Sequence, residues 1–227
     1  MRRKTPFEFL TYLAESAKED KKNGNNHDRI PPLTELSKEK GVSIASLREQ
    51  LGVARALGLV EVRPRTGIRR LPYTFSPAVS ESLDYAIQVD RKYFDNFSDL
   101  RKHIEADYWH EAVQLLTKED KQYLVELVDQ AWEKLHGSPI QLVHNEHRQL
   151  HVTIFRRLDN PFVIGIMEAY WDAYEKVGLN RYEDLAYLKS VWQFHRRIVD
   201  AICNEEYKQG FNLLLEHMDL IGHRYIA

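Results

Sequence analysis

The sequence predicts a mainly α-helical fold, with an N-terminal winged helix-turn-helix followed by an all-helical bundle of six or seven helices. Apolar residues recur at intervals of three and four along most of the 227-residue chain, which is typical of amphipathic helices. A Gly-Val-Ser turn and a short β-prone hairpin before residue 71 indicate the winged helix. With 43% hydrophobic and 29% charged residues, and no apolar run of about 18 residues, the composition excludes a membrane-spanning protein.

The first 41 residues contain two predicted helices. Apolar residues at helical spacing predict a helix over residues 6–20, and the polar run around Gly24 ends it. Pro31 and Pro32 precede a shorter second helix, and Gly41 closes it because glycine readily adopts the left-handed conformation of a helix C-terminus. Two helices therefore precede the Gly-Val-Ser turn.

A third helix and a hairpin complete the N-terminal unit. Ser43 is placed to cap the third helix, because its hydroxyl can accept a hydrogen bond from the free amides of the first turn. The helical repeat then continues to Gly58. Two β-prone segments, Leu59–Val62 and Gly67–Leu71, flank a turn and predict a hairpin. Three helices and a hairpin make a winged helix.

The remainder of the chain is predicted to be a linker and a helical domain. Residues 72–82 carry two prolines and no periodicity, so we expect them to join a domain at 1–71 to a second domain at 83–227. Pro139 and Pro161 are each placed to begin a helix. The expected helices lie near residues 81–90, 94–116, 118–136, 139–158, 161–177, 182–203 and 205–224.

The distribution of charge and the number of cysteines indicate which classes of function the chain is suited to. Residues 1–70 hold 15 Lys and Arg against 9 Asp and Glu, a net +6, whereas the remaining residues hold 17 against 25, a net −8. A basic N-terminal segment followed by an acidic remainder indicates a polyanion-binding domain joined to a second domain of another kind. The alternative is chance clustering of charged residues. Cys203 is the only cysteine, which excludes an intrachain disulfide framework and fits a reducing compartment. The basic N-terminus lacks the apolar stretch of a secretory signal, so we expect a cytoplasmic protein.

The winged helix supplies candidate DNA-binding residues. In a helix-turn-helix, the N-terminal part of the second helix faces base edges in the major groove. Arg48 there can reach a guanine or a phosphate, and short hydroxyls suit backbone oxygens. The alternative for each arginine is an ordinary solvated side chain. The candidates are Ser43, Ser46 and Arg48 on the helix and Arg63, Arg65, Thr66 and Gly67 on the wing.

Histidines interrupt the apolar stripes of three C-terminal helices. His147 and His151 are four residues apart, which places both rings on one face of a helix. His195 and His217 each lie on an apolar face of a later helix, so all four are expected to point inward. Each of them alone would be read as a core histidine bonded to a carbonyl. Together they predict a shared divalent metal, which would partner every ring in its neutral form.

The stretch at residues 34–68 resembles the GntR family of bacterial transcriptional regulators. The resemblance rests on the Gly-Val-Ser turn at 41–43, Leu47–Glu49, Gly58–Val60 and the glycine wing at 65–67. It implies a DNA-binding head that recognises a double-stranded operator. Thr34 and Ile44 stand where the family commonly has arginine, which removes two DNA contacts.

Residues 85–224 resemble the FCD effector-binding domain of the FadR-like branch of that family. Its spacing of metal-binding residues matches His147, His151, His195 and His217, with His147 standing where Asp or Asn is usual. The resemblance therefore implies a metal site, and four nitrogen donors favour zinc or nickel, with copper also suited, over magnesium or calcium. It also implies that Arg101 binds the carboxylate of a small organic acid; the alternative for Arg101 is an ordinary ion pair with Glu105, four residues later on the same helix.

Three functions follow as hypotheses. The leading one is a homodimeric transcriptional regulator whose helical domain binds a metal and a small carboxylate effector that modulates operator binding. The second is a regulator for which the metal itself is the signal. The third, a metal-dependent enzyme, lacks a placed acid or base carboxylate, so no enzymatic activity is expected.

Overall fold

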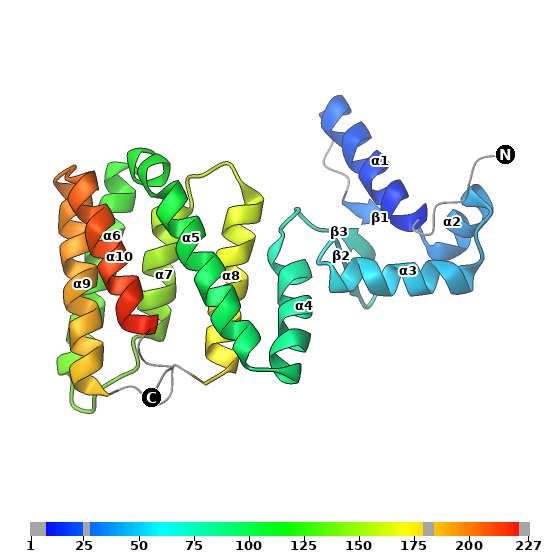
Figure 1. Cartoon of the computed structure of the whole chain (residues 1–227). Coiled ribbons are helices and arrows are strands. Elements are labelled where there is room, and N and C mark those ends of the chain that lie inside the picture. Colours follow the sequence, from blue (N-terminus) through cyan, green and yellow to red (C-terminus); the bar gives the residue numbers. More distant parts are fainter. Residues whose placement is uncertain (1–7, 25–27, 179–183, 223–227) are drawn as a thin grey trace. The chain divides into compact units, whose positions relative to one another are not determined.

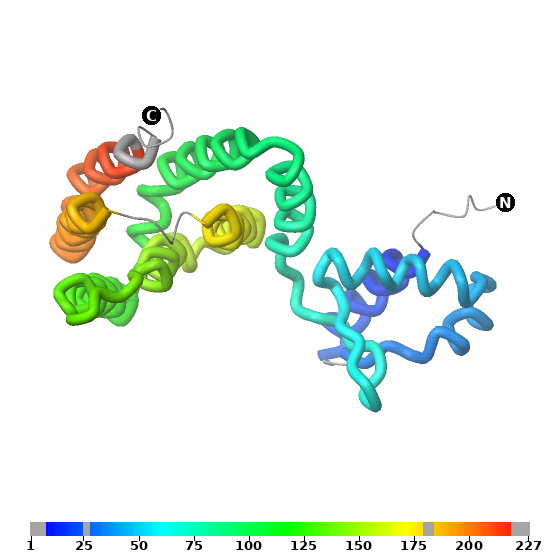
Figure 2. Tube along the Cα trace, turned by 90° about the horizontal axis from the view of Figure 1, so that it is seen from below, coloured from blue at the N-terminus to red at the C-terminus, as the bar shows by residue number. Residues whose placement is uncertain are grey.

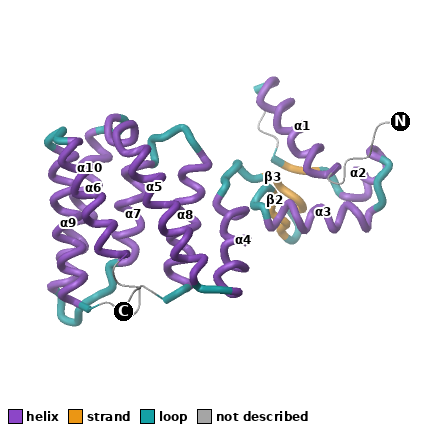
Figure 3. The backbone as a smooth tube through the Cα atoms, in the orientation of Figure 1, coloured by secondary structure: helices purple, strands orange, loops and turns teal. Residues whose placement is uncertain are grey.

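The computed structural model describes residues 8–24, 28–178 and 184–222. The chain divides into two compact units, Met1–Glu81 and Ser82–Ala227, and each is described by itself. In the described ranges, the first unit combines helices with a small sheet and the second is built of helices (Figures 1 and 3). The predicted fold class is therefore confirmed. None of the helices in these ranges is long and apolar enough to cross a bilayer.

The first unit is a three-helix winged helix. Its sheet is antiparallel in the order β1-β3-β2, with Val62 opposite Ile68 across the hairpin. The elements are α1 (Glu8–Asn23), β1 (Arg29–Ile30), α2 (Leu33–Lys40), α3 (Ile44–Ala56), β2 (Val60–Arg63) and β3 (Gly67–Arg70). The sequence did not predict β1, because two residues are too few to show a strand alternation.

Local chemistry explains where α2 and α3 end and begin. Gly41 adopts a left-handed conformation with φ of 65° and closes α2. Ser43 accepts a hydrogen bond from the backbone amide of Ser46, so the predicted N-cap is confirmed. Gln50 on α3 is buried and accepts a hydrogen bond at 2.8 Å from the Phe9 amide, which fixes α1 against α3. These contacts define the ends of α2 and α3 and hold α1 against α3.

Helices α4 to α10 form the second unit, and α4 begins before the division between the units. Seen along their axes, the helices from α5 onward surround a common interior (Figure 2). In that arrangement α10 packs against α9 and α5, while α7 packs against α5, α6 and α8. Their bounds are α4 (Ser76–Val89), α5 (Lys92–Gln114), α6 (Lys118–His136), α7 (His144–Phe155), α8 (Pro161–Lys176), α9 (Leu185–Cys203) and α10 (Tyr207–Gly222).

Two helix starts differ from expectation. Helix α4 begins at Ser76 instead of about residue 81, because a proline in the first turn of a helix gives up no intrahelical hydrogen bond. Seven residues of the expected 72–82 linker are therefore helical. Helix α7 begins at His144, not at Pro139, since the preceding segment folds back so that the Gln141 amide bonds Lys134 O. The start expected at residue 6, that at 182 and the end at 224 lie outside the described residues.

Other predicted boundaries hold. Pro161 occupies the first turn of α8, and the Asn160 side chain caps that helix by accepting from two backbone amides. Gly210 brings α10 close to α5, because a Cβ at this position would lie 2.7 Å from the Trp109 ring. The indole of Trp109 is completely buried and donates to Tyr207 O. These contacts fix the start of α10 and therefore the height at which His217 enters the interior.

Candidate functional site

Four histidine rings converge in the interior of the second unit. His147 and His151 come from α7, His195 from α9 and His217 from α10. One ligand atom from each lies within 4.8 Å of all the others. The closest pair is His195 and His217, whose Nε2 atoms are 3.1 Å apart. Residues separated by as many as 70 positions in the chain are thus brought to one point.

Burial keeps these rings neutral. His151, His195 and His217 have no exposed surface, and His147 is 8% exposed. Burial, with the positive potential of the neighbouring rings and of Arg101, holds the pKa of His147, His195 and His217 well below the ordinary value. The pKa of His151 is also lowered by burial, with Glu105 acting in the opposite direction. Neutral imidazole is the form that binds metals.

The rings carry buried nitrogens without partners. Within the described part of the chain, no hydrogen-bond partner exists for Nε2 of His147 and His151 or for Nδ1 of His195 and His217. Buried polar atoms normally have a partner, because leaving one unsatisfied costs about 1–3 kcal/mol. A tetrahedral zinc site with Zn–N bonds near 2.0–2.1 Å has nitrogens about 3.3 Å apart. The present spacing therefore suits a metal ion after small side-chain adjustments.

Arg101 and Glu105 reach this cluster from α5. Arg101 is 3% exposed, and its Nε donates to Glu105 Oε1 at 2.6 Å. Its Nη2 lies 2.9 Å from His151 Nδ1, and Glu105 Oε2 lies 3.2 Å from the same nitrogen. Burial would raise the pKa of Glu105, but the Arg101 guanidinium and the His151 ring hold it below the usual range. Arg101 therefore makes the predicted pair with Glu105 and also borders the histidines.

Aromatic side chains lie against the cluster, and the sequence did not predict two of them, Tyr170 and Trp171. The Trp171 ring on α8 lies 4.6 Å from that of His147, between ring centroids, and 5.1 Å from the Arg101 guanidinium. The Arg101 guanidinium also lies 4.3 Å from the Tyr170 ring centroid. The centroid of the Trp192 ring on α9 lies 4.8 Å from that of His195. The adjacent aromatics at 170 and 171 on a predicted helix were the available signal.

The candidate DNA-binding side chains at α3 differ in whether they already make hydrogen bonds within the protein. Arg48 is exposed. Ser43 caps its helix, and the Ser46 hydroxyl accepts from the Gln50 side chain at 3.1 Å. Both hydroxyls therefore already serve the fold, whereas Arg48 extends from the surface.

The wing candidates also divide into two kinds. Arg63 pairs with Glu61, its neighbour but one on β2, at 2.8 Å. Arg65, Thr66 and Gly67 form the exposed tip, where Arg65 and Gly67 have φ values of 68° and 78°. Left-handed residues at both positions produce the tight turn that projects the tip.

Comparison with known proteins places the helical unit in a family. Residues 96–220, more than half of the chain, match the model of the FCD domain family. No curated protein sequence matches the chain.

Solved structures share the fold at low sequence identity. Streptococcus agalactiae GntR is 16% identical, with 92% of this chain and 96% of that chain covered and a TM-score of 0.63. Listeria monocytogenes Lar is 13% identical, with both chains fully covered and a TM-score of 0.51. E. coli McbR/YncC is 19% identical, with coverages of 86% and 85% and a TM-score of 0.50. The helical unit matches the FCD domain model over more than half of the chain, and the chain therefore belongs to the FCD domain family.

Proposed function

We propose that this protein is a homodimeric, DNA-binding transcriptional regulator of the GntR type, that its helical unit binds a divalent transition metal and a small organic acid, and that the acid changes operator binding. One observation carries the proposal: four buried imidazoles each bring one ring nitrogen to within 4.8 Å of the others, and Nε2 of His147 and of His151 has no hydrogen-bond partner among the described residues. Because burial disfavours their protonated forms, the four rings are neutral, and a metal ion is a partner that one nitrogen of each ring can share.

The donor set determines the class of metal. His147, His151, His195 and His217 offer four nitrogens and no oxygen, which suits zinc, nickel or copper and disfavours magnesium and calcium. We place zinc or nickel first. When bound, the ion would act as a Lewis acid that attracts an anionic ligand; the residues around it would orient that ligand.

An organic acid fits the groups around the histidines. Arg101 is buried beside His151 and presents a planar set of donors that matches a carboxylate. The indole nitrogens of Trp171 and Trp192 are buried and have no hydrogen-bond partner in the described ranges. Both are donors only, so they need an acceptor. A small molecule carrying carboxylate or hydroxyl oxygens would provide one.

Operator binding is assigned to α3 and the wing. Arg48 is proposed to contact a base edge or phosphate, and Arg65, Thr66 and Gly67 are proposed to approach the DNA backbone or minor groove. Ser43, Ser46 and Arg63 are kept as phosphate-contacting candidates. A dimer is proposed because helix-turn-helix proteins read two half-sites one helical turn apart.

Fluorescence anisotropy on DNA from upstream of the protein's own gene tests the proposal. The full chain is compared in metal-stripped, zinc-loaded and nickel-loaded forms, with and without a panel of mono- and dicarboxylates. We expect at least one acid to change operator affinity only when metal is bound. His151→Ala should abolish this response, while His103→Ala, an exposed histidine on α5, should preserve it. An acid response that survives in the metal-stripped protein would contradict the proposal.

A metal-sensing regulator is the second candidate, and His147 favours it. With this fourth nitrogen, the protein alone can complete a tetrahedral coordination shell, as in closed structural zinc sites. In that case operator affinity would follow metal concentration and no acid would alter it. The same anisotropy series separates the two functions.

A further inference from the structure

Two buried side chains, Arg101 and Glu105, approach one ring nitrogen of His151. Arg101 and Glu105 lie one turn apart on α5 and both face His151 on α7. Arg101 Nη2 is 2.9 Å from His151 Nδ1, and Glu105 Oε2 is 3.2 Å from that atom. All three side chains are at most 3% exposed, so water competes little for these contacts.

The two contacts require opposite tautomers of His151. A guanidinium can only donate a hydrogen bond and an ionised carboxylate can only accept one. Nδ1 of a neutral imidazole either carries a hydrogen, which Glu105 accepts, or a lone pair, which Arg101 satisfies. One nitrogen cannot do both, so Arg101 and Glu105 compete for it.

The outcome of that competition determines whether Nε2 of His151 carries a hydrogen or a free lone pair. If Nδ1 donates to Glu105, Nε2 has a free lone pair. If Nδ1 accepts from Arg101, Nε2 carries the hydrogen and cannot bind a metal. His151 Nε2 is buried and has no hydrogen-bond partner among the residues described. Only the Glu105-bonded tautomer supplies a ligand to the cluster.

We infer that Glu105 is a positioning residue that holds His151 in the tautomer able to bind a metal, and that Arg101 opposes it. This inference rests on the proposed metal site and adds its regulation. When His151 becomes a ligand, Nδ1 changes partner from Arg101 to Glu105, and Nη2 of Arg101 loses its acceptor. The guanidinium is then free to bind an external carboxylate.

Linkage makes the relationship reciprocal. A carboxylate bound to Arg101 withdraws the donor that stabilises the non-binding tautomer, so it tightens metal binding by the same factor by which the metal tightens carboxylate binding. Outer partners of metal-binding histidines typically change metal affinity by roughly ten- to a hundred-fold. We expect a loss of that size when the Glu105 carboxylate is removed.

The first test reads the tautomer directly. Long-range ¹H–¹⁵N spectra of the full-length, ¹⁵N-histidine-labelled protein distinguish a hydrogen on Nδ1 from one on Nε2, and His151→Gln assigns the signal. With zinc bound, His151 is expected to carry its hydrogen on Nδ1. A zinc-bound state in which Nδ1 is the ligand would overturn the inference, and this result depends on no variant folding correctly.

The second test measures affinity. Glu105→Gln should lower zinc affinity by roughly ten- to a hundred-fold in competition with a chromophoric chelator, whereas Glu111→Gln, an exposed residue on the same helix, should leave it unchanged. His151→Gln separates the two levels of the argument. If it leaves zinc affinity unchanged, the proposed metal site itself fails. If it removes zinc binding while Glu105→Gln does not weaken it, the site stands and the role of Glu105 is refuted.

Discussion

His195 and His217 face each other across α9 and α10 with their Nε2 atoms 3.1 Å apart. In the neutral pair, one of these nitrogens must carry a hydrogen and the other must accept it. Both rings are fully buried, and the Nδ1 atoms on their far sides have no partner in the described part of the chain. The pair is therefore satisfied on one side only, and a bound metal would replace the internal hydrogen bond.

The metal-free protein should lose stability as the pH falls. Burial lowers the pKa of His147, His195 and His217 in the folded state, so the unfolded chain binds more protons below about pH 6.5. The free energy of unfolding then decreases with falling pH, by up to about 1.4 kcal/mol per pH unit for each such histidine. Urea titrations of metal-stripped protein between pH 7.5 and 5.5 measure this slope. His195→Gln should reduce it, and an unchanged slope would contradict the assignment.

Substituting His151 with Ala should remove bound metal. The rings of Trp171 and Trp192 lie 4.6 and 4.8 Å from His147 and His195, so nickel or copper at the cluster should quench tryptophan fluorescence. We expect both the metal content and the quenching to be lost in His151→Ala and retained in His103→Ala. Equal metal content in the two variants by elemental analysis would exclude His151 as a ligand.

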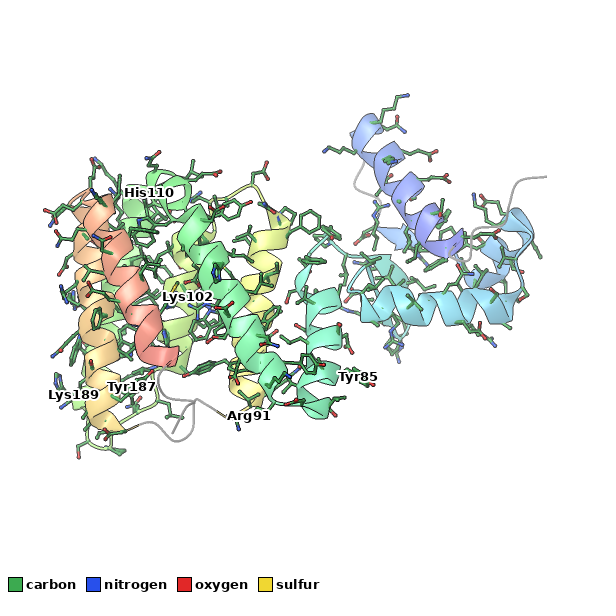
Figure 4. All side chains as sticks on the ribbon, in the orientation of Figure 1. Tyr85, Arg91, Lys102, His110, Tyr187 and Lys189 are labelled. Carbon is green, nitrogen blue, oxygen red and sulfur yellow. The ribbon has the colours of Figure 1, made fainter. Side chains whose placement is uncertain are left out.

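Arg101→Lys should separate acid binding from metal binding. Lysine retains the positive charge but lacks the planar fork that binds a carboxylate through two hydrogen bonds. We expect the acid response of operator binding to fall at least ten-fold while metal content remains. Arg91→Lys, at an exposed position just before α5, provides the control and should change neither quantity (Figure 4). An acid response equal to that of the unaltered protein would refute the role of Arg101.

Arg48→Ala should weaken operator binding. A specific arginine contact with a guanine contributes about 1–3 kcal/mol, or roughly a five- to hundred-fold change in affinity. Arg55→Ala removes the same charge from the opposite end of α3 and should have a smaller effect. Anisotropy at several salt concentrations measures both. If the two variants bind equally well, Arg48 does not read the operator.

Arg70 should matter for folding and not for DNA. It donates to Asp20 at 2.6 Å and to Ser16 at 3.1 Å, which ties β3 to α1, and both ionic groups are 16% exposed. We expect Arg70→Ala to cost about 1–3 kcal/mol in the free energy of unfolding. The pair of Arg69 with Asp28 is 3.5 Å long and nearly half exposed, so Arg69→Ala should cost about 0–1 kcal/mol. Similar losses in the two variants would contradict this difference.

Helical periodicity predicted most of the fold because it reports which face of a helix is buried. It was sufficient to place the four histidines on inward faces and to locate Ser43 and Pro161 at helix starts. It failed at Pro139, because a proline permits a helix start but does not require one, and here the chain turns back to bond Lys134 O. It also failed at Ser76, where the helix extends through a proline-containing segment.

The surroundings of the histidines were less accessible to sequence reasoning. The pairing of Arg101 with Glu105 follows from an i, i+4 spacing, but the contact of both with His151 joins residues 46 to 50 positions apart. No local pattern encodes such a contact. Trp171 lies in a helix in which several aromatics share the apolar face, and only tertiary packing determines which of them reaches His147.

Helix α4 is continuous, and it packs against the aromatic side chains near the histidines. Leu83 on this helix packs in one cluster with Phe94, Tyr170 and Trp171, and Trp171 in turn lies against His147. Because the helix runs without a break from Ser76 to Val89, a rotation imposed on its later turns is transmitted as a rigid rod to its first ones. Those first turns precede Ser82, where the second unit begins. The same unbroken helix therefore carries Leu83, which packs against the aromatic residues beside His147, and the residues that precede the second unit.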